Sequence, residues 1–130
     1  MIDARELRSI ARARLNDAEH LLRARRYDSG AYLCGYAVEL ALKARICKAL
    51  KWSGYPGTSA EFRGYQSFRT HDLAVLLRLS GREAKVTGTF GEEWRDVEWW
   101  TPDVRYRGGK TTRDDLAKMI ESTRRLLRAL

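Results

Sequence analysis

Cysteine, histidine and proline are scarce in this sequence, with two residues of each among 130. Cys34 and Cys47 fall in one apolar segment that we expect to be helical, which places them about 20 Å apart along the helix axis. A disulfide between them is therefore excluded, and we interpret both as small buried residues in a reducing cytoplasm. Two isolated histidines provide no zinc-type spacing, so we expect neither a metal nor another cofactor.

Several patterns that mark common protein classes are also missing. No apolar run is long enough to span a membrane, and no apolar N-terminal stretch resembles a signal peptide, so we expect a cytoplasmic protein without a membrane role. The sequence contains no phosphate-binding glycine loop, no HExxH motif and no nucleophile elbow, which excludes the commonest enzyme classes. At this length we expect a single helical domain over residues 1–130.

Acidic residues are fewer than basic ones, and the formal net charge is +8. Arginine supplies most of the excess, and its planar guanidinium suits forked contacts with phosphate or carboxylate. The composition favours an acidic partner such as a nucleotide, RNA or an acidic protein. The alternative is a basic surface that only contributes to solubility.

Strand-type alternation is absent, whereas helical periodicity is clear. We expect long helices over residues 3–26, 28–51 and 111–130, a third helix over 71–81 and a short extra helix over 90–100, with a loop at 82–88. Asp28 or Ser29 is the expected cap of the second helix, Thr70 that of the third, and Thr111 or Thr112 that of the last. The predicted fold class is all-α, an antiparallel up-and-down four-helix bundle.

The segment 28–51 is apolar on nearly every side, which is typical of a buried central helix. Glu39 and Lys43 are exceptions, four residues apart and therefore on one face. We interpret them as the polar centre of the fold, lying near His71 or Arg105, because unpaired charges are costly to bury. An ordinary ion pair at the edge of the core is the alternative. Gly35 indicates that another helix approaches closely.

Aromatic residues are concentrated in two places. The irregular segment 52–70 combines aromatic rings with arginines, which suits either stacking on bases or a lid over the core. The acidic segment 90–100 contains Trp94, Trp99 and Trp100, more indole surface than a short helix is expected to hide. We therefore predict a homodimer with these tryptophans at or beside the interface, its acidic residues meeting the arginines of the partner's first helix. The alternative is that the rings cover one end of the bundle.

Four pieces of the sequence, in order, resemble the HEPN domain family (higher eukaryotes and prokaryotes nucleotide-binding). They are Ala18-Glu19-x-Leu21-Leu22 with Tyr27-Asp28, the stretch from Gly35 to Ala44 that includes Tyr36, Glu39 and Lys43, then Thr70-His71-Asp72-Leu73, and finally Arg105-Tyr106. The resemblance implies a helical bundle that dimerises and works with a small nucleotidyltransferase in a toxin–antitoxin-like pair.

Some HEPN proteins cleave RNA without a metal, using an Arg followed after four to six residues by a His. This chain departs from that pattern, because no His follows Arg105 and neither Arg63 nor Arg69 precedes His71 at that distance. We therefore predict a non-catalytic module that binds a nucleotide or a partner protein, with a degenerate ribonuclease as the alternative. The predicted ligand-binding residues are Tyr36, Glu39, Lys43, His71, Asp72, Arg105 and Tyr106. His71 and Arg105 are the catalytic candidates of the alternative.

Overall fold

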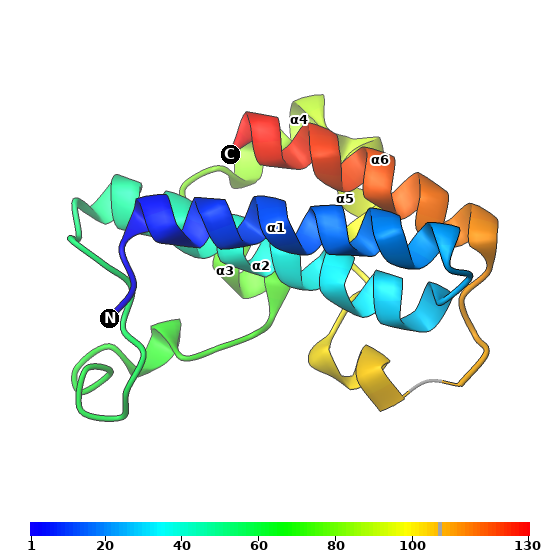
Figure 1. Ribbon diagram of the computed structural model, residues 1–130. Helices are drawn as coiled ribbons and strands as arrows, with labels where there is room; N and C mark the ends of the chain where they lie inside the picture. The colour runs from blue at the N-terminus through cyan, green and yellow to red at the C-terminus, as the bar shows by residue number, and fades with distance from the viewer. Residues whose placement is uncertain (107) are drawn as a thin grey trace.

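The computed structural model describes residues 1–106 and 108–130, and Figure 1 shows that helices make up the regular structure of this part. Three helices are long: α1 (Ala4–Arg23), α2 (Tyr27–Leu50) and α6 (Arg113–Ala129). A single isolated bridge pairs Ile2 with Tyr55, and the described residues contain no named strand. The predicted all-α fold class is confirmed.

Helices α1 and α2 form an antiparallel hairpin joined by residues 24–26 (Figure 1). Asp3 caps α1 by accepting a 2.8 Å hydrogen bond from the amide of Glu6. The predicted side-chain cap of α2 is wrong, since the N-cap position is Arg26 and carries no capping hydrogen bond. Asp28 instead accepts hydrogen bonds from the amides of Gly109 (2.6 Å) and Thr111 (2.9 Å), which connects the start of α2 to the start of α6.

Helix α2 lies at the centre of the fold, as predicted, and its contacts extend to α1, α3, α6 and the 3₁₀ helix η2 (Pro102–Tyr106). Cys34 and Cys47 are buried free thiols, in agreement with the sequence interpretation. The Cys34 thiol lies 3.1 Å from Oγ1 of Thr123 on α6. Burial raises the pKa of Cys34 to about 12, so this thiol is neutral at physiological pH.

Between α2 and α6 the described residues form, in addition to η2, three short α-helices and a second 3₁₀ helix. These are η1 (Gln66–Phe68), α3 (Leu73–Leu79), α4 (Glu83–Thr89) and α5 (Gly91–Val97). The loop predicted at residues 82–88 is therefore wrong, because α4 occupies it. Three long and three short helices in the described residues do not confirm the predicted count of four. The predicted cap of the last helix is confirmed at Thr112, which forms a capping box because Thr112 and Asp115 are bonded reciprocally.

The segment after α5 packs inward. Trp94 and Trp100 are buried within the chain, so the prediction that they are available to a subunit interface is wrong, whereas Trp99 remains 39% exposed. The Trp100 ring lies over Gly35, where an added Cβ would come within 2.2 Å of the indole. Gly35 thus allows a close approach, as predicted, although the neighbour is a ring rather than a helix.

The acidic side chains of α5 also have partners in the same chain. Glu93 lies 3.6 Å from Arg125, and Asp96 accepts a 2.6 Å hydrogen bond from Ser122. Within one chain these contacts go to α6 and not to the first helix, and a contact with the first helix of a second subunit stays a prediction. Across the described residues, no helix combines the length and the apolar character needed to cross a bilayer.

Candidate binding site

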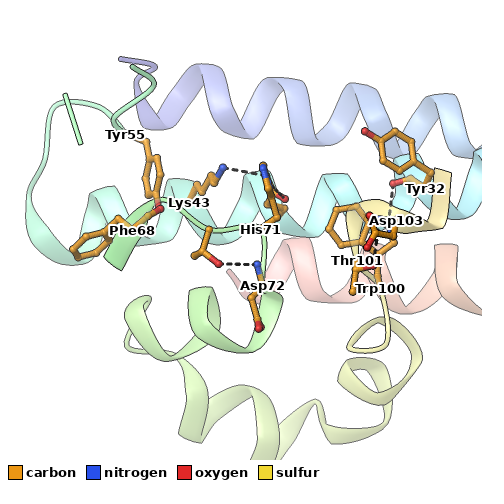
Figure 2. Close-up of polar contacts among 11 residues, drawn as sticks. Tyr32, Lys43, Tyr55, Phe68, His71, Asp72, Trp100, Thr101 and Asp103 are labelled. Carbon is orange, nitrogen blue, oxygen red and sulfur yellow. Dashed lines mark hydrogen bonds and ion pairs between the residues drawn. The ribbon is translucent and has the colours of Figure 1, made fainter. Parts of the chain in front are cut away.

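Glu39 is the centre of a polar cluster in the middle of α2. Its side chain is 2% exposed, and its two oxygens have different partners: Lys43 Nζ at 3.0 Å and His71 Nδ1 at 2.9 Å. Figure 2 shows Lys43 and His71 approaching each other from α2 and from the segment before α3. The predictions that Glu39 is interior and lies beside His71 are confirmed. A carboxylate can only accept, so His71 donates through Nδ1 and its Nε2 remains available.

The cluster extends from the core to the surface. The Lys43 side chain is 16% exposed, whereas the His71 side chain is 66% exposed. Burial of a lone carboxylate would cost several kcal/mol, and the two donors offset this cost. The buried anion thereby positions two nitrogen donors toward solvent.

The segment before α3 is shaped by short-range hydrogen bonds. Asp72, and not Thr70, caps α3, because its carboxylate accepts from the amides of Ala74 (2.9 Å) and Val75 (3.2 Å). The Thr70 hydroxyl in turn accepts from the amide of Asp72 at 3.0 Å. Asp72 therefore positions His71 by fixing the helix start, and both of its capping bonds are local.

Tyr36 lies one turn before Glu39 on the same face of α2. It is half-buried and stacks on Tyr32, with 6.4 Å between ring centroids. Burial raises the pKa of Tyr36, and the negative charge of Glu39 raises it further. The phenol is therefore a hydroxyl donor at neutral pH beside the cluster.

Arg105 and Tyr106 lie elsewhere. The guanidinium of Arg105 is 5.0 Å from the Tyr106 ring, and contacts with Tyr106 and Tyr32 raise the pKa of Arg105. Tyr32 precedes Glu39 by seven residues, about 10 Å along the helix. Arg105 also borders a small cavity of about 250 Å³ with Asp28 and Ser29. The structure does not bring Arg105 or the 77% exposed Tyr106 to His71 within one chain.

The aromatic segment 52–70 covers one side of the cluster. Tyr55 is buried, its hydroxyl donates to the Phe68 carbonyl at 2.5 Å, and Lys43 Nζ lies 5.2 Å from its ring centroid (Figure 2). Trp52 packs against Tyr55, Tyr65 and Phe68. These rings pack on one another, which supports the lid interpretation over base stacking.

The family comparison agrees with the residues that carry the cluster. The HEPN domain family model matches residues 4–59, which include α1, α2 and therefore Tyr36, Glu39 and Lys43. Residues 4–59 thus match the HEPN domain family that the sequence resembles. His71, Asp72, Arg105 and Tyr106 follow the matched segment. Neither the curated proteins nor the solved structures provided a match to this chain.

Several contacts at the cluster were not predicted from the sequence. Tyr32 connects Tyr36, Trp100 and Arg105, because its ring lies near the first two and its carbonyl accepts a 3.1 Å hydrogen bond from the Trp100 indole. The spacing of Tyr32 and Tyr36, four residues apart in an apolar helix, was the signal in the sequence that could have indicated their contact.

In the described residues no three His, Cys, Asp or Glu side chains come together as a metal site would require.

Proposed function

We propose that this HEPN-like protein is a non-catalytic binding module that recognises the phosphate of a nucleotide at the outer side of the Glu39 cluster. The observation that carries the proposal is the pairing of one buried carboxylate with two nitrogen donors, the partly exposed Lys43 and the exposed His71. Each donor uses only part of its capacity on Glu39, because Lys43 has three N–H groups and His71 retains Nε2. Tyr36 adds a hydroxyl on the same face.

Thermal-shift and calorimetric titration with mono-, di- and triphosphate nucleosides at millimolar concentration test this proposal. Stabilisation by at least one nucleotide is expected, and Lys43→Met with His71→Ala should remove it. Arg78→Ala is a suitable control, since Arg78 is exposed on α3 and lies outside the cluster. A full panel without any shift in the folded wild-type protein would refute nucleotide binding.

We further propose that the module acts with a small nucleotidyltransferase as a toxin–antitoxin-like pair, and that it forms a homodimer. Support comes from the match of residues 4–59 to the HEPN domain family. In the same way, we propose that α3 to α5, which return the chain toward the start of α6 in Figure 1, correspond to the fourth element of an up-and-down bundle. Co-purification of the tagged chain with the product of a neighbouring reading frame tests the partner, and sedimentation tests the dimer.

The ribonuclease alternative gains no specific support from the geometry. It requires His71 and Arg105 at one phosphodiester, since His would move a proton and Arg would stabilise the developing charge. The two side chains have separate partners in this chain, Glu39 for His71 and Tyr106 for Arg105. We expect purified protein to leave RNA intact, and cleavage that disappears with His71→Ala would reverse this conclusion.

A further inference from the structure

A groove of about 370 Å³ lies between α1, α2 and α6, on residues that the Glu39 cluster does not use. Ala11, Leu15 and Ala41 provide apolar surface from α1 and α2. Leu127 and Leu130, both partly exposed, provide it from the end of the chain. In Figure 1, α1 and α6 lie next to each other, and they are in contact. The groove therefore presents an apolar floor between two helices.

The rim of this groove is cationic. Two arginines come from α1 and two from α6: Arg8, Arg12, Arg124 and Arg128. Arg124 pairs with Glu19 and Glu121. Within the part of the chain that the structure describes, Arg8, Arg12 and Arg128 form neither an ion pair nor a side-chain hydrogen bond. Three of the four rim charges are thus available to an external anion.

A second observation extends this excess of positive charge beyond Arg8. The Nε atoms of Arg45 and Arg82 are buried and have no hydrogen-bond partner. Burial lowers the pKa of Arg45, and repulsion from Arg82 and Arg8 lowers it further. Like charges that repel one another gain the most from an added anion. Arg45 follows Ala41 by one helical turn, so this excess charge continues from the groove.

We infer that the groove between α1, α2 and α6 is a docking site for an acidic amphipathic helix of a partner protein. Such a helix matches both features, since its apolar stripe covers the leucine floor and its flanking carboxylates meet the unpaired arginines. Charge complementarity thus identifies the occupant. A nucleic acid would use the arginines but leave the apolar floor exposed.

A second copy of this chain matches the groove less well. Its long amphipathic helices α1 and α6 are themselves rich in arginine. Its acidic helix α5 uses Glu93 and Asp96 in contacts with α6 of the same chain. Self-association through this groove would therefore place cations opposite cations. The partner is a different protein with a carboxylate-rich helix.

Fluorescence anisotropy with a labelled synthetic peptide tests this inference on the full chain. The peptide should form about four helical turns, with leucines on one face and glutamates on both sides of them. We expect binding that weakens with rising ionic strength and that is lost when the leucines are replaced by serine. Arg12→Glu combined with Arg128→Glu should weaken binding by about tenfold or more.

Arg5→Glu is the matched control, because Arg5 is exposed on α1, does not line the groove, and undergoes the same reversal of charge. It should change affinity by less than about twofold. Circular dichroism melting curves establish that each variant is folded. Lys43→Met should leave peptide binding unchanged, which separates this result from a failure of nucleotide binding at the Glu39 cluster.

Two results would overturn the inference. One is equal affinity of the wild-type protein and the Arg12→Glu/Arg128→Glu variant for the peptide. The other is a peptide that fails to bind while single-stranded RNA or phosphatidylglycerol vesicles bind through Arg12 and Arg128. The second result would assign the groove to nucleic acid or lipid.

Discussion

Helix α2 is connected to the rest of the protein at two neighbouring places by opposite kinds of contact. At Glu39 a buried charge requires donors from two segments, whereas at Gly35 a missing side chain admits the Trp100 ring. The first contact is polar and reaches the surface, and the second is apolar and closed. Removal of one partner should therefore be costly at Glu39, and addition of a single methyl group should be costly at Gly35.

The largest effect is expected from Glu39→Leu. This change leaves the mostly buried Lys43 without its partner and should reduce the free energy of unfolding by about 3 kcal/mol. Lys43→Met in the same chain should recover most of that loss, because a pair replaced on both sides leaves no unpaired charge. Urea denaturation provides both values.

Glu121→Leu is the control for that comparison, since Glu121 forms only exposed ion pairs and should contribute about 0.5 kcal/mol or less. If Glu39→Leu were as mild as Glu121→Leu, the polar cluster would be an ordinary edge pair. That outcome would remove the distinction between the two contacts of α2.

Gly35→Ala should be next in size. Its methyl group would lie 2.2 Å from the Trp100 ring, so overpacking should reduce the free energy of unfolding by about 2 kcal/mol. Trp100→Leu should make the same glycine substitution much less harmful when both are present. Thermal unfolding of the single and double variants measures this coupling.

Gly88→Ala is the matched change in α4, where nothing lies near the added Cβ. Replacement of a helical glycine in open space by alanine should raise the free energy of unfolding by about 0.5–1 kcal/mol. Equal effects at Gly35 and Gly88 would show that the ring moves away at little cost.

A smaller effect is expected at Asp28, where the contact is polar but exposed. Burial raises the pKa of Asp28, but hydrogen bonds from Thr111 and from the amides of Gly109 and Lys110 together lower the pKa by more than burial raises it. The net shift of the pKa is therefore downward. Asp28→Asn should cost about 1 kcal/mol near neutral pH. A lowered folded pKa means that this contribution is present above the unfolded pKa of about 4 and is lost as pH falls through the folded pKa. Urea denaturation at pH 7 and pH 3 should show a larger difference between wild type and variant at pH 7.

The smallest effect concerns Cys34, the buried residue that directly precedes Gly35 on α2. Its buried thiol, with a pKa raised to about 12, should resist iodoacetamide at pH 8 in the folded protein and react after denaturation. Intact-mass spectrometry follows the reaction. Rapid labelling of Cys34 under native conditions would show that α6 separates readily from α2, because Thr123 covers this thiol.

The sequence predicted one member of each contact better than its partner. Glu39 and Lys43 are visible as charges in an apolar helix, and Gly35 as a costly residue in its interior. That Trp100 is the residue packed on Gly35 was not predictable, because Trp100 lies 65 positions later and its placement depends on how the short helices pack. The predicted cap of α2 was wrong for a related reason, since Asp28 accepts hydrogen bonds from the segment before α6 instead of from its own helix. Local rules describe the long helices well, and tertiary contacts decide the rest.

The central position of α2 has a consequence for the motions of the native protein. Helices α1, α3 and α6 and the 3₁₀ helix η2 all contact it, so none of them can detach without exposing its apolar surface. Its amides should therefore exchange with deuterium only when the whole chain unfolds, whereas exposed amides of the 52–70 segment should exchange through local opening. A ligand at Lys43 and His71 would connect α2, the slowest-exchanging helix, to the faster-exchanging segment before α3. The added protection from exchange on binding should therefore be found in the segment before α3 rather than within α2.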